Sequence, residues 1–237
     1  MSQVHFIALS GFLGDKSDWN HFSLSPLHAV DILDYREANF SSWAERFNGQ
    51  IFNQTSAPRC LIGYSMGGRL ALHALIQDPP LWDCAVIISA HPGLQNSQER
   101  RRRRVSDEAW AERFEHESWS KLLSAWNSQA VFQHSSSTFQ RDESQFDRER
   151  LANLLRWGSL GAQDDLRETI FSIHLPILWL VGEGDEKFVQ ICSSLKFHHP
   201  LSKVVALPGC GHRVPWDEPA LFEKTVLTFC RSIYDER

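Results

Sequence analysis

The segment Gly63-Tyr64-Ser65-Met66-Gly67 constrains the fold of this chain more than any other feature. An apolar run at 60–63 leads into it, and residues 68–77 continue with apolar side chains at helical spacing. A buried strand that ends in G-x-S-x-G and continues as a helix is typical of the nucleophile elbow. The glycines permit a strained turn that holds the serine hydroxyl out of the sheet, so we predict that Ser65 is catalytic.

Six short apolar runs have the continuous hydrophobicity of strands that are buried on both faces of a parallel sheet. These runs are 4–9, 29–33, 60–63, 85–89, 177–181 and 203–207. Helical periodicity at 68–77 and 219–233 separates or follows them, which predicts an α/β fold with a doubly wound, mostly parallel sheet. The first run is expected to be a strand rather than a signal peptide, because no basic leader or cleavage site accompanies it.

The alternation of strands and helices stops between residues 94 and 161. This stretch is rich in Arg, Glu, Gln, Trp and Ser, and helical patterns recur at 107–115, 119–127 and 148–157. We predict a helical cap insertion over 94–161, with 1–93 and 162–237 forming the core. The tract at 135–138 is expected to be a loop or mobile tip and to act as a linker rather than as a site.

Composition limits the classes of partner. The formal net charge of −5 argues against a nucleic-acid-binding protein, and no apolar stretch approaches the roughly 18 residues that span a membrane. The five cysteines form no CxxC pair, and several stand in apolar runs, so we expect free, mostly buried thiols and a cytoplasmic location. We further expect a monomer or a weak homo-oligomer.

A catalytic serine needs a base, and the base needs an acid that orients it. The expected order along the chain is serine, acid, histidine. Asp185 follows the apolar run 177–181 and is our candidate for the acid, with Glu183 as the nearby alternative and Glu186 as a weaker one. His212 follows the last run in a glycine-containing loop, and we predict that it is the base.

Catalysis also needs hydrogen-bond donors for a developing oxyanion. The backbone N–H of Met66 is one candidate, and the second is the N–H of Phe12 in the loop after the first run. That loop, SGFLG, is not a phosphate-binding motif, and no metal-ligand spacing is apparent. We therefore expect a mechanism without a cofactor or a metal.

Further segments narrow the α/β-hydrolase assignment. The stretch His91-Pro92-Gly93-Leu94-Gln95-Asn96, an arginine-rich segment and Ser106-Asp107-Glu108-Ala109-Trp110 follow the elbow in order. Together with GYSMGGR at 63–69, SLGAQDDL at 159–166 and GEGDEKF at 182–188, they strongly resemble the menaquinone-pathway 2-succinyl-6-hydroxy-2,4-cyclohexadiene-1-carboxylate (SHCHC) synthase family, MenH. The resemblance covers nearly the whole chain, and HPGLQN is its most specific part.

The resemblance implies a carbon–oxygen lyase of menaquinone or phylloquinone biosynthesis, which eliminates pyruvate from the enolpyruvyl intermediate SEPHCHC to give SHCHC. The triad would act as a general base, and the substrate would be a small polycarboxylate. Guanidinium groups match carboxylates geometrically. The residues that match the family's substrate-binding positions are Tyr64, Arg69, Arg103, Trp126 and Arg148, with Arg141 as the alternative to Arg148.

The chain departs from the family in its first loop, in a short segment between the first and third predicted strands, and at Asp164-Asp165, which replaces a Gln-Pro-Asp type sequence. The family's first loop usually has His-Gly-Phe, where this chain has Ser10-Gly11-Phe12, so the hydrogen bonding of that loop must differ. One alternative function also remains. The alternative is a serine carboxylesterase, a thioesterase or a carbon–carbon bond hydrolase that acts through an acyl-enzyme. Arginines clustered near the pocket favour the lyase, because a hydrolase of neutral esters has no need of them.

Overall fold

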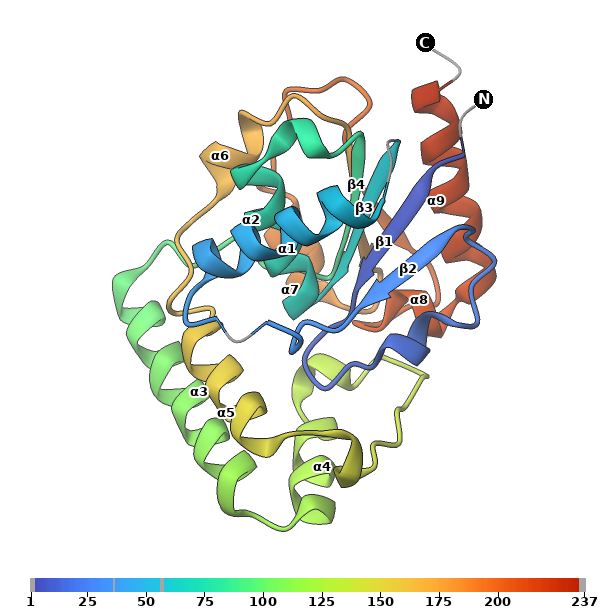
Figure 1. The fold of residues 1–237 in the computed structure, drawn as a ribbon. Helices are drawn as coiled ribbons and strands as arrows, with labels where there is room; N and C mark the ends of the chain where they lie inside the picture. Colours follow the sequence, from blue (N-terminus) through green and yellow to red (C-terminus); the bar gives the residue numbers. More distant parts are fainter. Residues whose placement is uncertain (1–2, 36, 56–57, 235–237) are drawn as a thin grey trace.

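A single sheet of six parallel strands forms the centre of the molecule (Figure 1). The computed structural model describes residues 3–35, 37–55 and 58–234. The strand order is β2-β1-β3-β4-β5-β6. The strands are β1 (His5–Leu9), β2 (Leu27–Val30), β3 (Arg59–Tyr64), β4 (Cys84–Ile88), β5 (Ile177–Gly182) and β6 (Lys203–Leu207). The prediction of an α/β fold with a parallel sheet is confirmed.

Helices connect the strands and cover both faces of the sheet. They are α1 (Phe40–Gln54), α2 (Met66–Gln77), α3 (Ser97–His116), α4 (Trp119–Asn127), α5 (Arg148–Trp157), α6 (Arg167–Phe171), α7 (Glu186–Cys192), α8 (Val214–Asp217) and α9 (Pro219–Tyr234). Side chains alternate along each strand, so β1 sends Ile7 and Leu9 into the layer that contains α1 and α2. Phe6 and Ala8 face the opposite layer, where Phe222 and other residues of α9 pack against them.

The element boundaries differ from the predictions mainly where polar residues interrupt a pattern. β2 ends at Val30 rather than at residue 33, because Asp31 begins a turn in which its carboxylate accepts the N–H of Leu33 at 2.8 Å. α1 had not been predicted. The predicted helix at 107–115 is the second half of a longer helix, α3, which begins where Asn96 caps it by accepting the N–H groups of Gln98 and Glu99.

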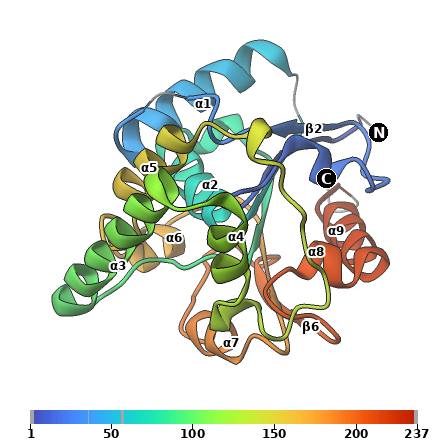
Figure 2. The same ribbon diagram turned by 90° about the horizontal axis from the view of Figure 1, so that it is seen from below.

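Helices α3, α4 and α5 lie together at the end of the molecule away from both termini (Figure 1). We call residues 94–161 the cap segment. Ala111 and Phe114 of α3 and Leu151 and Leu155 of α5 are buried in the same hydrophobic cluster as the sheet face that α1 and α2 cover. In the view from below, α3, α4 and α5 lie nearest the viewer, and α1 and α9 lie on opposite sides of the picture, at the upper left and at the right (Figure 2).

All five cysteines are free and buried, as predicted. The sulfur atoms of Cys60, Cys84 and Cys230 lie within 4.8 Å of one another between the sheet and α9. Among the residues that the structure describes, no helix has both the length and the apolar character needed to cross a membrane.

The buried imidazole of His73 on α2 predicts acid sensitivity of the fold. Its ring stacks on Phe40 at 4.3 Å, and within the described chain its Nε2 has no hydrogen-bond partner. Burial, with a smaller contribution from the charge of Arg69, lowers the pKa of His73 to about 4. The unfolded chain binds this proton near pH 6.5 and the folded chain does not, so stability falls as the pH drops below 6.5.

The wild type should lose unfolding free energy between pH 7 and pH 5. We expect this loss to be smaller by about 1–2 kcal/mol in His73→Leu, which has no imidazole to protonate. Urea unfolding at the two pH values measures this. His21→Leu, at an exposed histidine, is the control and should leave the pH dependence as it is. Equal pH dependence in His73→Leu and in the wild type would contradict the assignment.

Candidate active site

Ser65 lies in the sharp turn between β3 and α2, as the G-x-S-x-G pattern requires. Its φ of 53° and ψ of −112° are unusual for a residue with a side chain, and its N–H donates to Ile88 O at 2.8 Å. A Cβ at Gly67 would come within 2.6 Å of Leu9 O, and one at Gly63 within 2.7 Å of Gly67 O. Glycine is therefore required at both positions for α2 to cross the ends of β1 and β3.

The structure brings Ser65, His212 and Asp185 into one hydrogen-bonded line. His212 Nε2 lies 3.2 Å from Ser65 Oγ, and His212 Nδ1 lies 2.7 Å from Asp185 Oδ2. Both His212 and Asp185 are buried. The carboxylate therefore favours the tautomer with the proton on Nδ1, which leaves Nε2 free to accept the proton of Ser65.

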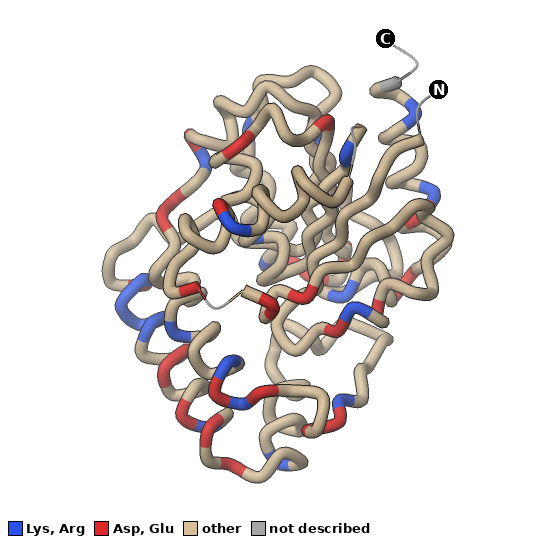
Figure 3. The backbone as a smooth tube through the Cα atoms, viewed as in Figure 1, with Lys and Arg blue, Asp and Glu red and all other residues tan. Residues whose placement is uncertain are grey.

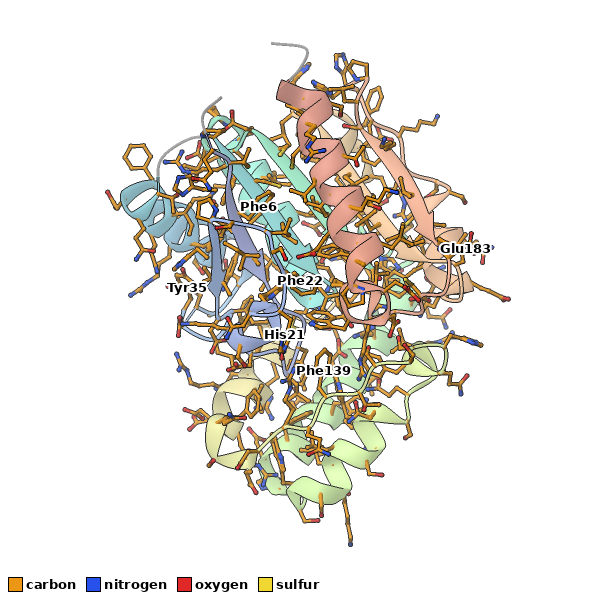
Figure 4. The ribbon with its side chains drawn as sticks, turned by 90° about the vertical axis from the view of Figure 1, so that its right-hand side faces the viewer. Phe6, His21, Phe22, Tyr35, Phe139 and Glu183 are labelled. Atoms are coloured by element: carbon orange, nitrogen blue, oxygen red, sulfur yellow. The ribbon has the colours of Figure 1, made fainter. Side chains whose placement is uncertain are left out.

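The geometry selects Asp185 from the three acidic candidates. Asp185 caps α7, accepting the N–H of Phe188 at 3.4 Å, and its other carboxylate oxygen faces His212. Glu183 and Glu186 are exposed, and Figure 4 shows Glu183 at the outer surface beside β6. Neither has a contact with His212 in the described chain.

The loop after β1 closely approaches the elbow. A Cβ at Gly11 would lie 3.3 Å from Ser65 Cβ and 2.9 Å from the Tyr64 ring, so only glycine fits there. Met66 is the first residue of α2, where helix geometry leaves its N–H without an intrahelical acceptor. In the described chain the N–H of Phe12 has no recorded acceptor either. Both predicted oxyanion donors are thus unused by the protein.

Ser10 stands where the family's first loop usually has a histidine. Its hydroxyl oxygen accepts Trp19 Nε1–H at 2.8 Å.

A cavity of about 370 Å³ opens in front of Ser65 and His212. Of the predicted site residues, it is lined by Phe12, Met66, Arg69, Arg103 and Trp126 in addition to those two. The cavity lies between the sheet end and the cap segment, whose Leu155, Leu160 and residues 129–132 form much of the wall.

Arg69 is a buried cation without a carboxylate partner in the described chain. Its Nη1 donates to Gly158 O at 2.8 Å and, at 3.4 Å, to Gln163 Oε1. Burial lowers its pKa, and the charge of Arg103 lowers it further. A guanidinium stays protonated in proteins even so. Arg69 therefore leaves a positive charge beside Ser65 whose hydrogen bonds, among the residues described, go to neutral oxygens, and its guanidinium lies 5.8 Å from the Phe40 ring.

Arg103 has a partner of its own. Its Nε donates to both oxygens of Asp107 at 2.8 and 2.9 Å, and Ser159 Oγ donates to the same carboxylate at 2.7 Å. Arg100 and Arg104 lie on the same face of α3 as Arg103, and both donate to Gly161 O. Figure 3 shows the resulting stretch of positive charge in the first half of α3.

Tyr64 and Arg141 lie next to this cavity rather than in it. They line a much smaller cavity of about 30 Å³ behind Phe12 and Trp126. Arg141 makes a buried, two-pronged ion pair with Asp18 at 2.7 and 2.8 Å. Burial raises the pKa of Tyr64 above its usual value. The Tyr64 ring lies 5.6 Å from the ring of His212 and against Gly11, so Tyr64 packs against both the catalytic histidine and the loop after β1.

Arg148 is the one predicted site residue that the structure places well away from Ser65. Its guanidinium donates to Phe114 O, to Glu117 O and to Glu143 Oε1. These groups surround the carboxyl end of α3, so Arg148 joins α5 to that helix end. Helical spacing alone could not show this, because the partners are mostly backbone oxygens from another helix.

Ser89, His91 and Lys187 also line this cavity, and the sequence analysis had assigned them no role. Ser89, just after β4, has a φ of 46° and a buried hydroxyl without a partner in the described chain. His91 accepts the N–H of Gly93 at Nδ1, 3.0 Å away, which shapes the HPGLQN turn. Lys187 stands two residues after Asp185. Ser89 is the polar last residue of the predicted apolar run 85–89, and this polarity was the signal that could have indicated it.

The tract 135–138 is a loop, as expected, and this loop, at 133–140, is tied by hydrogen bonds to the loop that carries His212. The backbone N–H of Arg213 donates to Ser135 Oγ. Its guanidinium donates from Nη1 to Ser137 O at 2.6 Å and from Nη2 to Asn127 Oδ1 at 2.7 Å. Its guanidinium also lies 4.2 Å from the Phe132 ring. Phe139 packs against Trp216 at 5.0 Å, where the cap segment meets the core (Figure 4).

We expect Arg213→Ala to release this loop and to lower the free energy of unfolding by about 2–3 kcal/mol, since two hydrogen bonds from a buried charge are lost. Urea unfolding measures the loss, and limited chymotrypsin digestion should cut faster after Phe139. Arg231→Ala, at an exposed arginine of α9, is the control. Unchanged stability and cleavage would show that Arg213 does not hold the loop.

Comparison with known proteins agrees with this geometry. Residues 3–225 match the Alpha/beta hydrolase family. The SHCHC synthase of Salmonella arizonae is 44% identical over 228 residues, covering 90% of this chain and 88% of that protein. The protein of the same name from Salmonella newport is 44% identical over 164 residues. This match covers 68% of this chain and 63% of the Salmonella newport protein, which is less than two thirds of that protein's length.

The fold has a counterpart among solved structures. MenH from S. aureus superposes with a TM-score of 0.85 and 23% identity, covering 99% of this chain and 96% of that one. At this identity the superposition establishes the shared fold, and the sequence match to the Salmonella arizonae protein establishes the narrower family. The chain therefore belongs to the Alpha/beta hydrolase family and, within it, to the 2-succinyl-6-hydroxy-2,4-cyclohexadiene-1-carboxylate synthases.

Proposed function

We propose that this protein is a carbon–oxygen lyase of menaquinone or phylloquinone biosynthesis that eliminates pyruvate from SEPHCHC to give SHCHC. The observation that carries the proposal is that one cavity is lined both by Ser65 and His212, which form a hydrogen-bonded line with Asp185, and by Arg69, whose guanidinium has no carboxylate partner in the described chain. The base supports proton abstraction, and Arg69 supports the binding of an anionic substrate. The family membership makes this the specific reaction to test.

Ser65 and His212 perform the first step. His212 Nε2 accepts the hydroxyl proton of Ser65, and Ser65 Oγ takes a proton from the substrate ring. The electron pair of the broken C–H bond forms a ring double bond, and the C–O bond to the enolpyruvyl group breaks. The leaving group departs as the enolate of pyruvate and gains a proton on carbon. Asp185 stabilises the imidazolium that exists in between.

The N–H groups of Phe12 and Met66 are placed to receive negative charge as the pyruvate portion leaves. Donors that are already oriented stabilise such charge without reorganisation at the moment of reaction. Arg69 and Arg103 bind carboxylates of the substrate, and Trp126 forms an apolar wall. Tyr64 positions His212 and the Phe12 loop, because its ring packs against both. The position of Arg148 does not support a direct contact with substrate.

We further propose the remaining properties that the sequence suggested. Residues 94–161 form a cap inserted into a core made of 1–93 and 162–237. The protein works in the cytoplasm as a monomer or weak homo-oligomer on a small molecule, with neither nucleic acid nor a cofactor involved.

The direct test is to incubate the protein with SEPHCHC and to follow pyruvate through the oxidation of NADH by lactate dehydrogenase. Parallel reactions contain p-nitrophenyl esters. We expect pyruvate release, and a loss of at least about 1,000-fold in kcat for Ser65→Ala, because the proton acceptor is gone. Fast ester turnover without pyruvate release would instead establish the serine hydrolase, which the same triad geometry would serve through an acyl-enzyme.

Arg103 provides a second test. We expect Arg103→Gln to raise KM about tenfold with a smaller change in kcat, since one charged hydrogen-bonding group to the substrate is lost. Arg101→Gln removes the same charge from an exposed position on the same helix and should leave both parameters unchanged. If the two variants behave alike, Arg103 has no role in the cavity.

A further inference from the structure

A second, outer chamber between α3 and α7 adjoins the cavity in front of Ser65. The outer chamber has a volume of about 610 Å³ and shares His91, Arg103, Leu160 and Lys187 with the inner cavity. These four residues form the neck between the two spaces. A ligand that lies against Ser65 is therefore separated from the outer chamber by these shared side chains alone among the described residues.

The outer chamber is strongly cationic. Arg102, Arg103, Arg167 and Lys187 line it, against the carboxylate of Glu99 alone among the described lining residues. Arg103 and Arg167 are already paired, with Asp107 and Asp165 respectively. Lys187 has no hydrogen bond or ion pair in the part of the chain that the structure describes. Its exposed ammonium can pair with an anion without first breaking another contact.

The neck combines two uncharged side chains with two cations. Leu160 is apolar, and His91 is neutral at physiological pH, because burial and the charges of Arg167 and Lys187 lower its pKa to about 3. These two side chains suit the methylene groups of a substrate arm. Of the two cations, Arg103 is paired with Asp107, which leaves the ammonium of Lys187 to receive an anionic end of that arm.

We propose that the outer chamber binds the carboxylate of a flexible aliphatic arm of the substrate, and that Lys187 is the residue that holds it. The inference rests on the proposed function and deepens it. The reacting ring stays in the inner cavity beside Ser65, and the leaving group faces Phe12 and Met66. The arm that does not react passes the neck, so Lys187 is a specificity-determining residue for substrates with a 3-carboxypropanoyl group.

The test compares Lys187→Gln, Lys187→Arg and the matched control Arg101→Gln in the pyruvate-release assay. We expect Lys187→Gln to raise KM about tenfold and to leave kcat within about twofold, as for a lost charged contact made equally in the ground and transition states. Lys187→Arg should restore most of the affinity. Arg101→Gln should match the wild type. Adding about 0.3 M NaCl screens long-range attraction, and the effect should persist there.

A binding measurement separates this inference from the proposed reaction. Calorimetry with 3-benzoylpropanoate and with butyrophenone compares two aryl ketones that differ in a carboxylate on the arm. The wild type should prefer the acid, and Lys187→Gln should lose that preference. If the wild type releases no pyruvate but shows this Lys187-dependent preference, the proposed reaction fails and the chamber remains an arm-binding site.

Two results would overturn the inference while leaving the lyase assignment intact. One is pyruvate release by Lys187→Gln with the wild-type KM and an unchanged preference between the two ketones. The other is a KM effect that disappears at high salt, since this would mean that Lys187 only attracts anions from a distance.

Discussion

The crossing of α2 over the ends of β1 and β3 is the contact on which the rest of the site depends. Gly67 lies against the carbonyl oxygens at the end of β1, and Gly63 against the first turn of α2. This approach fixes the backbone of Ser65 and places the N–H of Met66 next to the Phe12 loop. A methyl group at either glycine would push α2 away and separate the serine from both its base and its donors.

Much of this arrangement could be predicted from the sequence, because it depends on local patterns. Continuous apolar runs marked the strands, and the order of Ser65, Asp185 and His212 along the chain predicted a hydrogen-bonded line that the structure contains. The arginines were harder. Arg103 and Arg148 have the same side chain on neighbouring helices, yet one reaches the cavity and the other the end of α3.

The difficulty has a physical origin. A guanidinium is long and donates in several directions, so its partner is decided by packing between helices that lie far apart in the sequence. The cap segment shows this repeatedly: Arg69, Arg100 and Arg104 all donate to backbone oxygens at 158–161. Carbonyl oxygens leave no mark in a sequence. The same reason explains why the 133–140 loop was taken for a linker, since Arg213 holds it through Ser137 O and two polar side chains.

The hydrogen bonds of Arg69 also bear on stereochemistry. Both of its recorded bonds use Nη1, and within the described chain the Nε and Nη2 groups have no acceptor. These two groups form one edge of the planar guanidinium, and a carboxylate that binds there must lie in the same plane. Because Arg69 is fixed to Gly158 and Gln163, that plane is fixed relative to Ser65. A carboxylate held in this plane and a second one bound by Arg103 in the same cavity would together fix which face of a chiral ring meets the serine, so the protein would discriminate between mirror-image substrates.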